Sequence, residues 1–219
     1  INGGATYAGA FYGCTSLKTV SLPDSITSIG ERAFYGCTNL TEVSLPYSVT
    51  NVAESAFSYC TSLVEILLPE NITVIGENAF SHCTSLSSLL LPDSITEVEG
   101  NAFEGCTKLS NVKLSNQLET LGYHAFGNCA SLTQIEIPKS LKYTPCSSGY
   151  DYGPFNGSGL KTVTFEYGTS EIPSSLFYHA TNLQNIVFVD TITSINGGAT
   201  YAGAFYGCTS LKTVSLPDS

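Results

Sequence analysis

The opening string of the chain recurs unchanged at its other end. The string INGGATYAGAFYGCTSLKTVSLPDS occupies 1–25 and again 195–219. A match of this length indicates a duplication, in which one long period is followed by the start of the next. We therefore expect a fragment cut from a longer array. Repeat arrays are usually recognition surfaces rather than enzymes.

A shorter period is marked by phenylalanine. Nine units are expected, because a marker recurs at one constant interval through the first six and at unequal intervals afterwards: Phe11, Phe34, Phe57, Phe80, Phe103, Phe126, Phe155, Phe177 and Phe205. In each unit, apolar and polar residues alternate as in a half-buried strand, and a second short apolar pair follows. The marker segment is too short for a helix and predicts a tight or 3₁₀-like turn. No unit can bury its apolar row alone, so the pattern predicts a solenoid with a short parallel strand ladder and little α-helix.

The repeated pattern I-G-x-x-A-F-x-x-C-x-x-L-x-x-V-x-L-P-x-S resembles the 23-residue, spirochaete-type leucine-rich repeat of BspA-like bacterial surface proteins. The resemblance covers nearly the whole chain, and the Phe155 and Phe177 units depart from it most. It implies a curved leucine-rich-repeat solenoid outside a bacterium or mucosal protist, often an adhesin that binds host matrix proteins or neighbouring cells. We treat 1–219 as a single solenoid fragment with insertions near 2–10, 144–154 and 196–204.

Composition excludes several partners. Charged residues make up only 12% of the chain, and the net charge is −10 with eight Lys and Arg, so the electrostatic footprint for nucleic acid or anionic lipid is missing. No apolar run approaches the roughly 20 residues that span a bilayer, so we expect no membrane insertion in this fragment. A secretion signal and an anchor are expected outside it. Without polar capping units, end-to-end self-packing is also expected.

Seven of the eight cysteines share one position, the third after the marker phenylalanine. Neighbouring rungs would bring these cysteines within bridging distance. However, the irregular units place Ser158 and Ala180 there, which indicates that the position selects small size. We therefore expect a row of free, buried thiols. Ligands that are one repeat apart in a row do not enclose a metal ion. Cys146 lies in an insertion, and whether it is free or bridged is left open.

The sequence offers no catalytic constellation. The three histidines occupy unequal positions in their units and share no carboxylate, and the glycine-rich INGGAT lacks the GK[ST] of a phosphate-binding loop. Paired carboxylates, a nucleophile elbow and a metal motif are absent as well. The sequence therefore predicts neither an enzyme nor a cofactor.

The outward positions of the strand ladder form the first candidate binding surface. Leu67 and Leu90 on adjacent rungs would make a small apolar spot beside Glu42 and Glu65. This spot is either a contact patch or a scatter of ordinary exposed side chains, because single exposed leucines are common.

The insertions form the second candidate surface. They share one register, and insertions in repeats often carry binding residues. The loops of the Phe155 and Phe205 units are two rungs apart, about 10 Å. Tyr150 and Tyr152 would then lie near Tyr201 in an aromatic ridge, and Tyr7 is its equivalent in the first copy. The alternative is that these loops only pad an irregular rung.

These observations favour a secreted or cell-surface recognition module that takes part in adhesion. Its expected partners are proteins or glycans of the host surface, the host matrix or neighbouring cells. The alternative is a structural spacer in a long surface array, although a pure spacer has no need of tyrosine-bearing loops.

Overall fold

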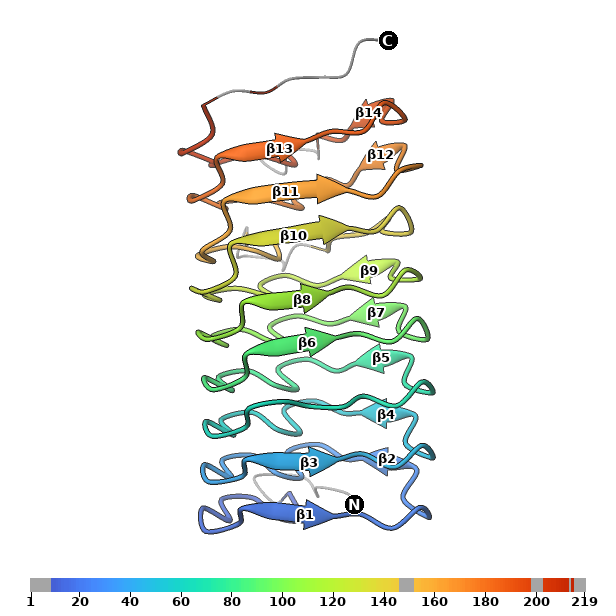
Figure 1. The fold of residues 1–219 in the computed structure, drawn as a ribbon, viewed down its shortest axis with the longest axis vertical. Coiled ribbons are helices and arrows are strands. Elements are labelled where there is room, and N and C mark those ends of the chain that lie inside the picture. Colours follow the sequence, from blue (N-terminus) through green and yellow to red (C-terminus); the bar gives the residue numbers. More distant parts are fainter. Residues whose placement is uncertain (1–8, 146–151, 198–202, 213, 215–219) are drawn as a thin grey trace.

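The chain folds as a solenoid of stacked rungs. The computed structural model describes residues 9–145, 152–197, 203–212 and 214. Most rungs contribute a short strand to one face of the stack, which runs from Thr19–Ser21 at one end to Asn185–Val187 near the other (Figure 1). The described residues contain strands and turns but no helix. The predicted leucine-rich-repeat architecture is confirmed.

The longer strands form the ladder predicted from the alternating pattern. All pairings are parallel, and the register matches outward position to outward position, as in Thr19 with Glu42 and Gln134 with Thr162. The central residue of each strand, such as Val43, faces the core. The strands are β1 (Thr19–Ser21), β3 (Glu42–Ser44), β6 (Ser88–Leu90), β8 (Asn111–Lys113), β10 (Gln134–Ile137), β11 (Thr162–Phe165) and β13 (Asn185–Val187).

The second apolar pair of each unit forms a second parallel ladder. Five of its strands are joined in one sheet and two in another. Its members are β2 (Ser28–Ile29), β4 (Asn51–Val52), β5 (Val74–Ile75), β7 (Glu97–Val98), β9 (Thr120–Leu121), β12 (Glu171–Ile172) and β14 (Ser194–Ile195). The two sheets separate where the chain carries its insertion at 144–154.

The marker phenylalanines stack in one column through the core. Neighbouring rings lie nearly parallel, with centroids 5.1 Å apart between Phe11 and Phe34 and 5.8 Å apart between Phe126 and Phe155. The rings from Phe34 to Phe177 are fully buried. Each sits in a hydrogen-bonded turn that also bonds to the next rung, as where the Phe57 N–H donates to the Ala79 carbonyl at 2.7 Å. The segment is therefore a tight turn, as expected.

The cysteines line a parallel row, and every described cysteine is free. From Cys37 onward, each thiol of the row donates to the carbonyl of a marker phenylalanine in the preceding rung, as from Cys60 to Phe34 at 3.1 Å. Ser158 instead donates to Phe155 of its own rung. The expected burial is confirmed for the five cysteines of the middle rungs, whereas Cys14 is exposed and Cys208 is partly buried. The thiols also link neighbouring rungs. Cys146 lies outside the described residues.

Close contact between rungs leaves no room for a side chain at Gly122. A Cβ there would lie 2.5 Å from the backbone carbon of Glu99 and 2.5 Å from the backbone nitrogen of Gly100. Because backbone atoms cannot move aside cheaply, Gly122→Ala should lower the free energy of unfolding by about 2 kcal/mol. Urea denaturation measures this loss. Gly197→Ala is the matched control, since a Cβ there meets no atom within 4 Å. Equal stability of the two variants would contradict the close approach.

Candidate ligand groove on the strand-ladder face

The outward face of the long ladder is uncovered and mostly polar. Hydroxyl and amide side chains occupy most of its outward positions, with few ions. Glu42, Asn111 and Gln134 are exposed, and Thr162 and Thr164 are half-buried. Neutral side chains of this kind can donate and accept hydrogen bonds from a partner without a large desolvation cost.

Among the described residues the ladder is interrupted at two junctions, one between the rung of Leu67 and β6 and one between β8 and β10. At ordinary junctions the main chains bond directly, as where the Leu91 N–H donates to the Lys113 carbonyl at 3.0 Å and the Thr162 N–H donates to the Thr133 carbonyl at 3.1 Å. Over the described residues of β8 and β10, no such bond joins the two strands. The rungs still touch on their turn side, where the Ser131 N–H donates to the Thr107 carbonyl.

The interruption leaves main-chain groups without partners among the described residues. In a parallel strand, alternate residues direct both their N–H and C=O groups to the same neighbouring strand. Asn111 and Lys113 bond to β6, so Val112 faces β10. The residues that flank Gln134 and Glu136 bond to β11, so Gln134 and Glu136 face β8. Three residues therefore present main-chain donors and acceptors to the gap.

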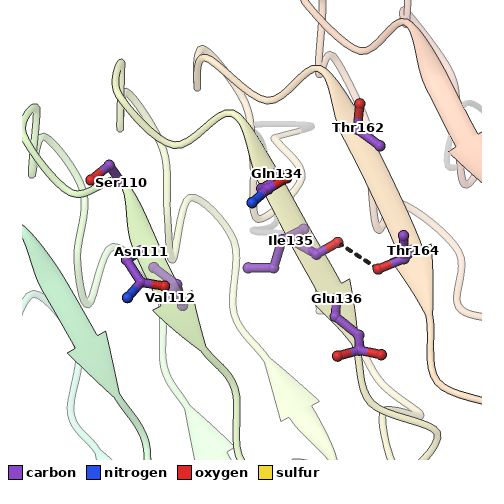
Figure 2. A pocket seen from close by; sticks show the side chains of 8 residues that line it. All are labelled: Ser110, Asn111, Val112, Gln134, Ile135, Glu136, Thr162 and Thr164. Atoms are coloured by element: carbon purple, nitrogen blue, oxygen red, sulfur yellow. Dashed lines mark hydrogen bonds between the residues drawn. The ribbon is translucent and has the colours of Figure 1, made fainter.

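These groups border a groove of about 300 Å³. Figure 2 shows Asn111, Gln134 and Glu136 on the two strands that flank it, with threonines on β11. Ile135 is almost fully buried, whereas Val112 remains partly exposed beside the gap. The Thr164 hydroxyl lies 3.5 Å from the Ile135 carbonyl, to which it donates. The complete lining is Ser110, Asn111, Val112, Gln134, Ile135, Glu136, Thr162 and Thr164.

Among the described residues that line the groove, Glu136 is the only ionisable one. Lys113 and Glu166 line the adjoining hollow, which has a volume of about 80 Å³. The Lys139 ammonium lies 2.8 Å from the Glu166 carboxylate, and its hydrogen bond lowers the pKa of that carboxyl. The groove itself is therefore polar and slightly anionic.

The four ladder residues singled out from the sequence lie on the same face but outside this groove. Leu67 and Leu90 are 67% and 61% exposed, and Glu42 and Glu65 are exposed as well. Leu67 forms an isolated bridge with Ser44, and Leu90 pairs with Lys113. That these side chains act as a contact patch stays a prediction.

Of the four tyrosines in the predicted ridge, the structure describes one. Tyr7, Tyr150 and Tyr201 lie outside the described residues. The Tyr152 ring is 40% exposed and packs against His124 of the preceding rung, with centroids 4.6 Å apart. Burial lowers the pKa of His124. The ridge itself stays a prediction.

A second, polar groove runs along the turns that carry the marker phenylalanines. Its residues show that one expectation from the sequence was wrong. From the sequence, the histidines are expected to share no carboxylate. In the structure, the Glu104 carboxylate lies 3.1 Å from the His82 imidazole, and its charge also acts on His124. Glu104 further accepts a hydrogen bond from Asn128 at 2.9 Å. Stacking of successive rungs brings together residues that are distant in sequence. The positions of these residues relative to the marker phenylalanine of each unit could have indicated the contact.

Comparison with known families gives one decisive match. A model of the BspA-type leucine-rich repeat region, in six copies, matches residues 7–109 and 75–202. The chain belongs to this family. Membership of the BspA-type family is consistent with a protein-binding recognition module. No curated protein matches the chain.

One solved structure shows the same fold, and two others are similar to the chain at lower scores. The chain is similar to the Treponema pallidum leucine-rich repeat protein, with 26% identity and a TM-score of 0.55 over 89% of this chain and 78% of that one. A leucine-rich repeat protein from Bacteroides ovatus is 24% identical, with a TM-score of 0.44 over 95% and 69% of the two chains. A leucine-rich cell surface protein from Faecalibacterium prausnitzii is 23% identical, with a TM-score of 0.40 over 93% and 74%.

Metal sites and membrane-spanning helices are both absent from the described residues. No three His, Cys, Asp or Glu side chains gather there in a way that could hold a metal ion. No helix in that part of the chain has the length and apolar character needed to cross a membrane.

Proposed function

We propose that this BspA-type chain is a secreted or cell-surface recognition module that binds protein or glycan partners through its strand-ladder face, in adhesion. The observation that carries the proposal is the gap between β8 and β10, where unpaired main-chain groups and neutral polar side chains border a groove on the strand-ladder face. The family resemblance, which implies a surface location, supports it.

The scaffold suits this role physically. Stacked rungs hold the outward side chains in fixed positions, so little conformational entropy is lost when a partner binds. The long duplication would present the same face repeatedly, and identical sites at regular spacing raise avidity.

The test is a binding screen with face-blocking variants. The immobilised chain is presented with matrix proteins, host cells and glycan arrays. Asn111→Arg with Thr162→Arg adds bulk and charge to the ladder face and should weaken binding to any captured partner at least tenfold. Thr181→Arg is the matched control, since Thr181 is exposed and lies outside the strand ladder. A chain that binds nothing in the screen would be a spacer, and equal binding by all variants would exclude this face.

We further propose that the tyrosine-bearing insertions add a second contact region. Tyr152 supports this, because its ring is partly exposed at the base of the insertion. Tyrosine combines a large contact area with a low cost in side-chain entropy. Replacing Tyr150 and Tyr152 by alanine should reduce adhesion to cells or matrix, while circular dichroism verifies that the chain still folds. Unchanged adhesion would reject the aromatic ridge.

A further inference from the structure

The width of the gap between β8 and β10 restricts what can fill it. Paired strands lie about 4.8 Å apart, so a peptide strand inserted between two others requires about 9.6 Å. Cα atoms of β8 and β10 still approach within 8 Å of each other. The gap is therefore too narrow for an added strand. The two strands nevertheless make none of the direct main-chain bonds seen at the neighbouring junctions.

A bridging oxygen atom can join two strands that do not bond to each other directly. An oxygen that bonds to both an N–H and a C=O holds the two groups two hydrogen-bond lengths apart, each of ~2.8 Å. Such an oxygen must accept from one strand and donate to the other, as a hydroxyl group does. Val112, Gln134 and Glu136 supply the main-chain donors and acceptors from the two sides.

The groove is larger than one water molecule requires. Its volume of about 300 Å³ is at the lower limit of small-ligand sites and many times the roughly 30 Å³ of one water molecule. The partly exposed Val112 offers an apolar contact for the C–H groups of a ring. The side chains of Asn111, Gln134 and Thr164 can bond further hydroxyls at the rim.

Charge selects among hydroxyl-rich ligands. Glu136 lines the groove, and the chain carries a net charge of −10, so sialic and uronic acids are repelled. The Glu136 carboxylate is an acceptor for neutral hydroxyls, and hydrogen bonds to a charged acceptor are stronger than neutral ones.

We propose that the groove between β8 and β10 binds one neutral sugar residue of a glycan, whose hydroxyls bridge the main-chain groups of Val112, Gln134 and Glu136. This inference rests on the proposed recognition function and assigns it a ligand class and a site. A sugar of this size should bind alone with a Kd of about 1 to 10 mM.

The test is an NMR titration of the ¹⁵N-labelled chain with neutral hexoses and N-acetylhexosamines, and with sialic acid and glucuronate as anionic comparators. Saturable shifts are expected at the amides of Val112, Gln134 and Glu136, and only with neutral sugars. Gln134→Ala and Glu136→Gln should each raise the Kd at least tenfold. Gln184→Ala and Glu70→Gln, which change exposed residues away from the groove, are the matched controls and should leave the Kd unchanged.

Several outcomes would overturn the inference. One is the absence of shifts at these amides with every neutral sugar; another is an equal response to anionic sugars or to an extended peptide. A crystal soaked in the responding sugar that shows only ordered waters in the groove would also contradict it. If partners are captured in the binding screen but the groove variants bind them normally, the sugar site is wrong and the recognition function stands. If a sugar binds the groove but no cell, matrix protein or glycan is captured, the sugar site stands and the adhesive function is wrong.

Discussion

Replacing Phe80 by alanine is expected to lower the free energy of unfolding by about 4 kcal/mol. Phe80 is fully buried, and its ring lies 5.3 Å from Phe57 on one side and 5.3 Å from Phe103 on the other. Its removal exposes a cavity to both neighbours, so the lost transfer free energy is increased by the cost of the unfilled space. Urea denaturation followed by circular dichroism measures the effect.

The loss of stability should depend on where the replaced phenylalanine lies in the column. Phe11 is only partly buried and is described as stacking on Phe34 alone, so Phe11→Ala should cost clearly less than Phe80→Ala. Tyr167 is 71% exposed, and Tyr167→Ala should change stability by no more than about 0.5 kcal/mol. If Phe80→Ala cost no more than Tyr167→Ala, the phenylalanine column would not be the core of the solenoid.

The phenylalanine column could be predicted because the regular spacing of these residues indicates that they are buried. A side chain that recurs once in every unit in an apolar context can be hidden only if successive units stack in register. The same reasoning placed Glu42 and Leu67 on the outward face and the cysteines inside, and the structure agrees except for Cys14, which is exposed. Small size at the cysteine position was readable from Ser158 and Ala180. The hydrogen bond from each thiol to a phenylalanine carbonyl could not be predicted from the sequence, because it depends on the backbone of a different rung.

The groove could not be predicted from side-chain pattern. Asn111-Val112-Lys113 and Gln134-Ile135-Glu136 alternate in the same way as strands that do pair, so nothing in their residues indicates a missing ladder. Main-chain pairing depends on the distance between rungs, which the pattern does not encode. The lengthened interval between Phe126 and Phe155 is no signal for the groove, because it spans the junction of β10 and β11, which do pair.

The buried thiols should make the fold sensitive to alkali. Burial raises the pKa of Cys37 and Cys208 from 9.0 to about 11 and that of Cys106 to about 12, and it raises the pKa of Cys83 and Cys129 as well. Below pH 9 these thiols are protonated in both the folded and the unfolded chain, so their contribution to the free energy of unfolding is fully present. Above pH 9 they ionise first in the unfolded chain, which then binds fewer protons than the native one. Stability therefore falls as pH rises toward the native pKa values, by about 1.4 kcal/mol per pH unit for each such thiol.

Urea denaturation between pH 7 and pH 10.5 measures this slope, and substitutions assign it to the thiols. Cys83→Ala combined with Cys129→Ala should make the alkaline slope shallower by about 3 kcal/mol per pH unit, and Ala180 shows that alanine suits this position in the native chain. Cys14→Ala is the matched control, because Cys14 is exposed and should leave the slope unchanged. The phenol of Tyr123, whose pKa is raised to about 12 chiefly by its hydrogen bond to Glu77, acts in the same direction in every variant and cancels in the comparison. An alkaline slope that is identical in the double variant and the parent chain would mean that the cysteine row is open to solvent, and the packing of rung on rung would then need to be redrawn.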